Sequence, residues 1–213
     1  LREENKIAYI NEKKYECLAR YWKEPDQVFM TNDGQKLIVG YNSIVSGKSE
    51  IVVYDLMGNK WQLNQVINTD EFLKTYNNLP LFSKKSAFRG IRTTIGGISE
   101  DLKTILLIGS GIAIVYRLNS DGKYQQIGQT LVENDENYSR SDSFLTGNID
   151  QTGNRIALVL PKKDVVIIYD YDQQENRWIE TQRISSPNDS LNASFGKSIA
   201  FGNKGKQLLL GTN

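Results

Sequence analysis

Histidine is absent from this chain of 213 residues, and cysteine occurs once, as Cys17. The first absence excludes histidine-dependent catalysis and removes the commonest zinc ligand. A single cysteine excludes an internal disulfide and any metal site built from several thiolates. No apolar run approaches the roughly 18 to 20 residues that a membrane-spanning helix needs, so we expect no direct membrane insertion.

The chain also lacks an excess of either charge. Its 26 Lys and Arg side chains nearly balance 25 Asp and Glu, which leaves a net charge of +1. Such a balance gives no general attraction to nucleic acid or to anionic membranes, so we expect no nucleic acid partner. With 39% hydrophobic residues, a chain of this length is able to bury a substantial core.

What the sequence does contain is a repeated unit of about fifty residues. One half of the unit is an aliphatic run that ends in Tyr, followed by an aromatic residue and a second, more polar run. Its copies lie at residues 7–21, 51–67, 114–131 and 166–184. The other half is a polar turn followed by an aliphatic run, with copies at residues 33–40, 101–109, 153–159 and 205–211.

The content of each unit predicts strands. The runs are short, rich in Val, Ile and Tyr, and bounded by Gly, Asn and Asp, and they show no helical period. Tyr9, Tyr54, Tyr116 and Tyr169 are 45, 62 and 53 residues apart, and each interval holds four candidate strands. This is the size of a propeller blade. The sequence therefore predicts an all-β fold, a β-propeller of four-stranded antiparallel blades.

The predicted organisation is one propeller domain, or a propeller fragment, over residues 1–213. It holds three whole blades and two half blades, at residues 5–23, 26–67, 89–131, 143–184 and 195–213. Two arrangements are open. Because exposed strand edges invite pairing, the two half blades could close a ring of four. Alternatively the chain is part of a larger ring and an excerpt of a longer polypeptide, which the absence of an initiator Met favours.

The repeat resembles a known family. The segment from Phe195-Gly196 through Gly205 to Gly211, followed in the unit by a strand such as Ile167-Ile168-Tyr169 and by Trp178, resembles the FG-GAP repeat of integrin α-subunit propellers. The Phe-Gly pair itself survives in one unit only. A WD-repeat propeller is the second resemblance, carried by residues 31–40 and 53–55. The Trp that opens the last strand of a blade favours FG-GAP.

The FG-GAP resemblance implies a protein-binding or adhesion propeller, at the cell surface or outside the cell. Many such repeats bind calcium in an Asp-rich loop between their first two strands, because a hard cation needs several converging oxygen ligands. The matching turns here are residues 32–34, 99–101, 150–154 and 203–205, and none presents more than two adjacent carboxylates. Plain hairpin turns explain them. We therefore expect no metal site and no cofactor.

The conspicuous aromatic residues have a structural explanation. Because they recur at fixed places in the unit, we predict that they pack between neighbouring sheets. They are Tyr54, Trp61, Tyr116, Tyr169 and Trp178.

Loop lengths point to a functional surface. In a propeller the connections from the second to the third strand, and from one blade to the next, emerge at the same end. Every long segment of this chain belongs to that set, at residues 41–50, 68–88, 132–142 and 185–194. Variable loops on a rigid scaffold commonly carry function. In the longest loop, we predict that another protein contacts Tyr76, Phe82, Lys84 and Lys85.

Two classes of function are therefore open. The first is a non-catalytic scaffold for protein interaction or adhesion, acting through the end with the long loops. The second is a propeller enzyme, a carboxylate-based hydrolase or lyase with its site at the central channel. The absence of histidine and of a recurring carboxylate pair favours the first class.

Overall fold

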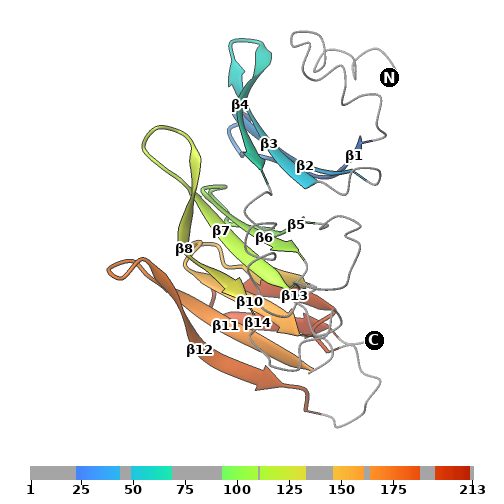
Figure 1. Ribbon diagram of the computed structural model, residues 1–213, viewed down its shortest axis with the longest axis vertical. Coiled ribbons are helices and arrows are strands. Elements are labelled where there is room, and N and C mark those ends of the chain that lie inside the picture. The colour runs from blue at the N-terminus through green and yellow to red at the C-terminus, as the bar shows by residue number, and fades with distance from the viewer. Residues whose placement is uncertain are drawn as a thin grey trace, which may run out of the picture. The chain divides into compact units, whose positions relative to one another are not determined.

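The computed structural model describes residues 23–43, 49–68, 93–109, 111–132, 146–160, 164–187 and 195–211. Every regular element within these ranges is a β-strand, as predicted (Figure 1). The chain divides into two compact units. The strands up to residue 68 belong to the first unit, and those from residue 94 onward belong to the second.

The first unit contains one antiparallel meander, here called blade 1. Its strands are β1 (Lys23–Met30), β2 (Lys36–Ser43), β3 (Ser49–Met57) and β4 (Lys60–Asn68), in that spatial order. β1 begins three residues before the predicted strand because Lys23, Glu24 and Pro25 pair with the end of β2 across a bulge. The rest of the predicted leading half blade lies outside the described residues.

The second unit contains two further four-stranded sheets. Blade 2 comprises β5 (Thr94–Ile98), β6 (Thr104–Gly109), β7 (Ile112–Leu118) and β8 (Tyr124–Val132). Blade 3 comprises β9 (Thr146–Ile149), β10 (Arg155–Leu160), β11 (Val165–Asp172) and β12 (Arg177–Ser185). Both are antiparallel with their strands in sequence order, as the repeat predicts.

A two-stranded sheet ends the second unit. It consists of β13 (Ser198–Gly202) and β14 (Gln207–Gly211) and is here called the half-sheet. It matches the two strands predicted for the trailing half blade, residues 195–213. Among the described residues β14 pairs with β13 alone, whereas β2, β6 and β10 each pair on both sides.

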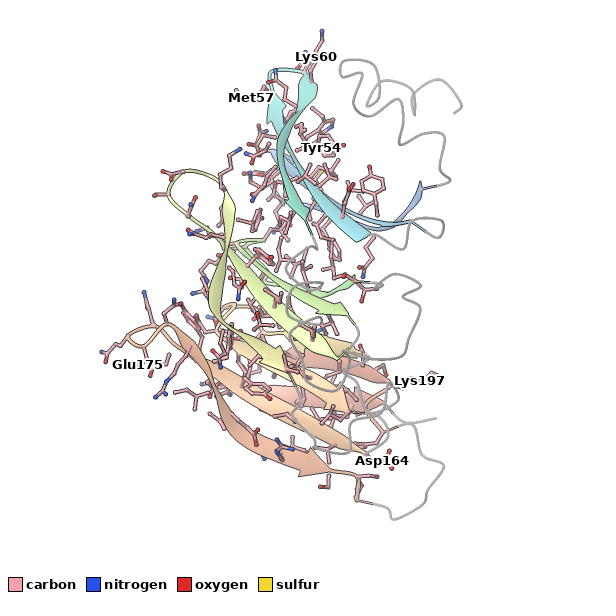
Figure 2. The ribbon with its side chains drawn as sticks, in the orientation of Figure 1. Tyr54, Met57, Lys60, Asp164, Glu175 and Lys197 are labelled. Carbon is pink, nitrogen blue, oxygen red and sulfur yellow. The ribbon has the colours of Figure 1, made fainter. Side chains whose placement is uncertain are left out.

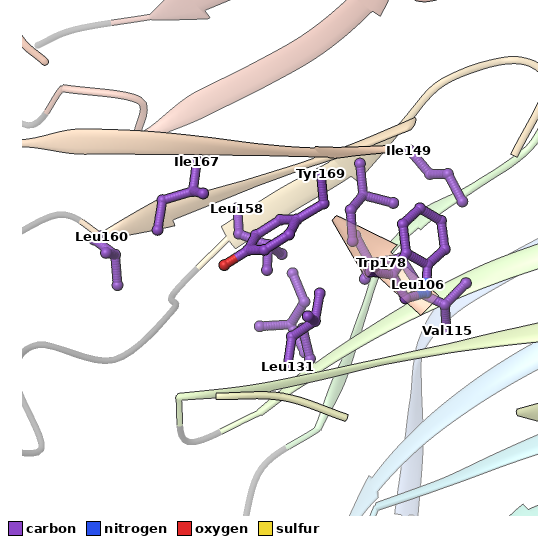
Figure 3. Packing of buried hydrophobic residues seen from close by; sticks show 12 residues of the cluster. Leu106, Val115, Leu131, Ile149, Leu158, Leu160, Ile167, Tyr169 and Trp178 are labelled. Carbon is purple, nitrogen blue, oxygen red and sulfur yellow. The ribbon is translucent and has the colours of Figure 1, made fainter. Parts of the chain in front are cut away.

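Blades 2 and 3 are joined by a continuous apolar core. Leu106, Ile108 and Val115 of blade 2 pack in one cluster with Ile149, Leu158, Ile167, Tyr169 and Trp178 of blade 3 (Figure 3). The aliphatic runs therefore fill the space between sheets rather than one face of a single sheet. This is why β6 and β10 are almost wholly buried along their length.

A second cluster joins blade 3 to the half-sheet. Ala157, Val159, Val166 and Ile168 are buried against it together with Phe195. The half-sheet contributes its partly buried apolar residues, which are Ile199, Phe201, Leu208 and Leu210. Blade 3 and the half-sheet thus repeat the same arrangement, each packing one face on the sheet before it.

The predicted packing between sheets is confirmed for Tyr169 and Trp178. Tyr116 is buried, whereas Trp61 in the first unit is not. Tyr116 and Tyr169 are each 8% exposed and Trp178 is 2% exposed. In blade 1, Tyr54 is half-buried and Trp61 is 38% exposed. Trp178 is covered by the blade that precedes its own. The segment predicted to precede blade 1 lies outside the described residues.

Candidate interaction surface

The four residues predicted to contact a partner all lie outside the described part of the chain. Tyr76, Phe82, Lys84 and Lys85 belong to the connection between β4 and β5, within residues 69–92. What the structure does define is the scaffold from which this connection departs.

One end of the second unit carries only short turns. Residues 99–103, 150–154 and 203–206 join the first strand of a sheet to the second, and residues 119–123 and 173–176 join the third to the fourth. These turns satisfy their own backbone groups: Leu102, Gly153 and Gly205 each donate their N–H to the residue three before them, at 2.9 to 3.1 Å. Glu175 marks this end at the tip of the β11–β12 hairpin (Figure 2).

The opposite end carries the long connections. Asp164 directly precedes β11 and Lys197 directly precedes β13, and both residues lie at this end (Figure 2). The connections between sheets at this end, residues 133–145 and 186–197, are longer than any turn at the other end of the second unit. The connection that holds Tyr76 and Phe82 likewise leaves the fourth strand of a sheet and enters the first strand of the next.

The carboxylates of the short turns are engaged within those turns. Asp150 is 3% exposed and accepts hydrogen bonds from the N–H groups of Asn154 and Arg155 at 2.9 and 3.0 Å, and from the Thr152 hydroxyl at 2.7 Å. Asp101 accepts in the same way from the Ser99 hydroxyl at 2.7 Å. No group of three or more His, Cys, Asp or Glu side chains suited to hold a metal ion occurs among the described residues.

A turn of the same length joins the first two strands of blade 1, at residues 31–35. The Asp33 carboxylate accepts a hydrogen bond from the Gln35 N–H at 2.9 Å. Hydrogen bonding with Thr31 and with the Gln35 backbone lowers the pKa of this fully exposed carboxyl below its ordinary value.

Two arginines connect successive sheets of the second unit at the end that carries the short turns. Arg155 donates one N–H to the Gly205 carbonyl of the half-sheet at 3.1 Å, while its other nitrogens hold Asp170 in a bidentate pair at 2.6 and 2.9 Å. This pairing raises the pKa of Arg155, so the group stays charged. Gly205 comes so close that a Cβ there would lie 2.9 Å from the Asp150 carboxylate.

Arg117 makes the equivalent contact one sheet earlier. It donates to the Gly153 carbonyl at 2.6 Å and to the Thr104 hydroxyl at 3.1 Å. Arg117 is half-buried, and burial lowers the pKa of its guanidinium below the ordinary value. Gly153 and Gly205 occupy the same turn position, both with positive φ, at 74° and 79°.

The two arginines come from different strands of their sheets. Arg117 of β7 lies directly opposite Thr104 of β6, whereas Arg155 of β10 lies opposite Asp170 of β11. The arginine therefore comes from the third strand in blade 2 and from the second strand in blade 3. The sequence repeat does not reveal these contacts, because the residues do not align.

A bulge in β8 receives the tryptophan of blade 3. The Gln129 side chain accepts from the Trp178 N–H at 2.8 Å and donates to its carbonyl at 2.7 Å. The indole N–H donates to the Ile127 carbonyl at 3.3 Å. A Gln follows the aromatic residue in three units, as Gln65, Gln129 and Gln182. This recurrence was the signal that the sequence offered, although it does not reveal the role of Gln129.

The first strands of the sheets pack closely. β5, β9 and β13 lie side by side, and a Cβ at Gly97 would come within 2.9 Å of the Ile149 backbone nitrogen. Their sequences are TIGGI, TGNI and SIAFG, without Asp or Glu in these three described strands. A carboxylate pair at the channel would therefore have to come from other residues.

The pair that carries the FG-GAP resemblance serves packing. Phe195 is 5% exposed and lies in the cluster between blade 3 and the half-sheet. Gly196 has φ of +75°, and a Cβ there would lie 2.9 Å from the Val159 side chain. Gly196 also donates its N–H to the Gly211 carbonyl at 3.1 Å, which fixes the entrance to the half-sheet.

The exposed large apolar side chains are few, and most lie on two sheets. In blade 1 they are Val28, Met30, Met57, Trp61 and Leu63. In the half-sheet Leu209 is 70% exposed, the highest value among them. Ile179 of β12 is the remaining one in the described residues. No helix long and apolar enough to cross a membrane was found in the part of the chain that the structure describes.

Comparisons with known proteins support the fold and leave the family open. No family model matches the chain, and no curated protein matches it by sequence. The FG-GAP resemblance therefore finds no support in these comparisons. Solved structures do match, and the chain spans about half of their length or less in most cases.

The matching structures include enzymes and binding proteins. The periplasmic gluconolactonase PpgL of Pseudomonas aeruginosa matches at a TM-score of 0.53 and 12% identity, covering 89% of this chain and 50% of its own. The Dos1 propeller matches at 0.54 and 11% identity, covering 92% and 43%. KlAtg21, in complex with the coiled coil of AgAtg16, matches at 0.52 and 13% identity, covering 87% and 50%. The chain is all-β and matches part of a β-propeller.

Proposed function

We propose that this protein is a non-catalytic β-propeller scaffold that binds another protein through the end carrying its long connections. One observation supports this most: the turns at one end of the second unit are short and internally hydrogen-bonded, while the long connections gather at the other end. A rigid frame with variable loops on one side is the usual form of a recognition surface. The FG-GAP resemblance adds that such a surface serves adhesion or protein interaction.

The residues proposed for the contact are Tyr76, Phe82, Lys84 and Lys85. They combine two aromatic side chains with two positive charges in the longest connection. Aromatic residues supply much of the binding energy at protein interfaces, and positive charges direct the approach of an acidic partner. We therefore propose a partner with an acidic rim around an apolar pocket.

The enzyme alternative has less support. One matching structure is described as a periplasmic gluconolactonase and another as a putative 6-phosphogluconolactonase of Bacteroides uniformis, but identities of 12% and 15% indicate the fold alone. The first strands of the second unit supply no carboxylate, and the buried Asp150 is committed to its own turn.

The test compares two charge-reversed variants by affinity capture from the source cells. In the first, Lys84→Glu and Lys85→Glu are combined with Tyr76→Ala and Phe82→Ala. The matched control carries Lys204→Glu and Lys206→Glu, which make the same charge change in an exposed turn at the opposite end. We expect the first variant to lose the proteins that the wild type captures and the control to keep them. Equal capture by both variants would contradict the proposal.

A further inference from the structure

Asp is followed by Gly at two places in the chain, Asp33-Gly34 and Asp121-Gly122. The first pair lies in the turn between β1 and β2, and the second lies in the turn between β7 and β8. In each turn the Gly N–H donates to the carbonyl oxygen three residues before it, at 2.8 and 3.1 Å. Both glycines have positive φ, at 68° and 72°, and both Asp side chains are exposed. The two turns therefore form a matched pair with the same turn hydrogen bond.

Where Gly follows Asp, isoaspartate forms without an enzyme. The Gly nitrogen attacks Cγ of the protonated Asp carboxyl, a C–N bond closes a succinimide ring, and the carboxyl hydroxyl leaves as water with the amide proton. Water then adds to the ring. Where it breaks the bond between the nitrogen and the main-chain carbonyl carbon, the chain continues through Cγ as isoaspartate. Glycine permits the attack because it carries no Cβ to hinder its nitrogen.

The carboxylate of the first pair is engaged. Asp33 accepts a hydrogen bond at 2.9 Å from the Gln35 N–H, two residues further along the chain. Hydrogen bonding with Thr31 and with this N–H lowers the pKa of Asp33 below its ordinary value. Both effects disfavour the protonated, unbonded carboxyl that ring closure requires.

The carboxylate of the second pair lacks that donor. The equivalent N–H, of Lys123, donates instead to the side-chain oxygen of Asn119 at 3.0 Å, as does the Asp121 N–H. Among the described residues the Asp121 carboxylate has a single hydrogen-bond contact, with the Ser120 hydroxyl at 3.5 Å. This is longer than an ordinary hydrogen bond between two oxygens. Asn119 thus takes the donor that engages Asp33 in the other turn.

We propose that Asp121 is a site of isoaspartate formation, and that the modified chain is a substrate for a protein-isoaspartate carboxyl methyltransferase, whereas Asp33 is protected. The inference is independent of the proposed function, since the turn at residues 119–123 lies at the end opposite the long connections. Isomerisation inserts Cβ into the main chain before Gly122, so the Lys123 N–H moves away from Asn119. The change stops at Tyr124, which opens β8 and is 3% exposed.

The test incubates the full folded chain in a mildly acidic buffer, with samples taken over several weeks and digested with trypsin. Cleavage after Arg and Lys places Asp121 in the peptide 118–123 and Asp33 in the peptide 24–36. Isoaspartate has the mass of aspartate, so each peptide is scored by its shifted retention time and by methylation with recombinant isoaspartate methyltransferase. We expect the modified fraction of 118–123 to grow about fivefold faster, the factor that one net hydrogen bond supplies.

Controls separate the folded turns from their sequences. The same two peptides incubated alone should isomerise at similar rates, because Gly follows Asp in both. Asp121→Glu should abolish the signal in 118–123. Thr31→Val removes the hydroxyl bonded to Asp33 and should raise the rate in 24–36 while 118–123 is unchanged. Equal rates in the folded wild type, a faster rate in 24–36, or no response to Thr31→Val would overturn the proposal.

Discussion

Trp178 of β12 lies against Gly128 of β8 so closely that a Cβ at residue 128 would be 2.6 Å from the indole Cδ1. The contact is reinforced at both main-chain groups of the tryptophan by the amide of Gln129. The outer strands of blades 2 and 3 are therefore joined through a single aromatic residue and the bulge that receives it.

Replacing this glycine should destabilise the protein. In Gly128→Ala the new methyl group meets the indole, and the backbone at φ of +64° disfavours a side chain. Together these effects should lower the free energy of unfolding by about 2 to 4 kcal/mol. Urea unfolding followed by tryptophan fluorescence measures the change.

Gly122→Ala is the matched control. Gly122 has a similar φ of +72°, but nothing lies within 4 Å of a Cβ placed there. We expect a loss of only about 1 to 2 kcal/mol, from the backbone alone. If the two variants lose equal stability, the close contact with Trp178 contributes nothing.

Arg117 should matter more to stability than an arginine on the surface. In Arg117→Met the Gly153 carbonyl and the Thr104 hydroxyl both lose a donor at the contact between sheets. Unsatisfied buried groups cost about 1 to 3 kcal/mol. The comparison is Arg183→Met, which breaks a salt bridge between side chains that are 47% and 38% exposed. We expect that change to cost less than about 1 kcal/mol, and a reversed order in thermal unfolding would contradict the assignment.

The pKa of Glu180 should respond to Arg183. The bidentate pair, at 2.6 and 2.9 Å, holds the pKa of Glu180 below its ordinary value of 4.5. The salt bridge therefore stabilises the folded state above the ordinary pKa, and this contribution is lost as the pH falls through the lowered folded pKa. In Arg183→Gln the pKa should rise toward 4.5 in an NMR titration. An unchanged value would show that the pair does not persist in solution.

Sequence periodicity was sufficient to predict the sheets because the inner strands of blades 2 and 3 are buried and apolar along their length, whereas an outer strand such as β12 is polar and largely exposed. β6 and β10 lie in the aliphatic runs predicted within residues 101–109 and 153–159, and β10 extends one residue further. The buried state of Tyr116, Tyr169 and Trp178 followed from their recurrence. The exposure of Trp61 did not, because recurrence cannot say whether a neighbour is present to cover the residue.

The contacts that join the sheets were beyond the reach of the sequence. Gly128 looks like an ordinary glycine within a strand, and its role depends on where Trp178 arrives from another sheet. Arg117 and Arg155 look like surface charges until the register places them beside the glycine turns of the next sheet. The predicted contact residues Tyr76, Phe82, Lys84 and Lys85 stay a prediction, since they lie outside the described residues.

The exchange between Arg117 and Arg155 has a consequence for how such chains are compared. At each junction a guanidinium reaches the carbonyl of the glycine at the equivalent turn position, Gly153 or Gly205. It comes once from the third strand and once from the second. An alignment of one blade on the next sets Thr104 against Arg155 and Arg117 against Asp170, and scores both columns as mismatches. What the two junctions share is the position of the guanidinium group beside the turn glycine. A comparison of sequences column by column does not detect it, whereas a superposition that includes the side chains does.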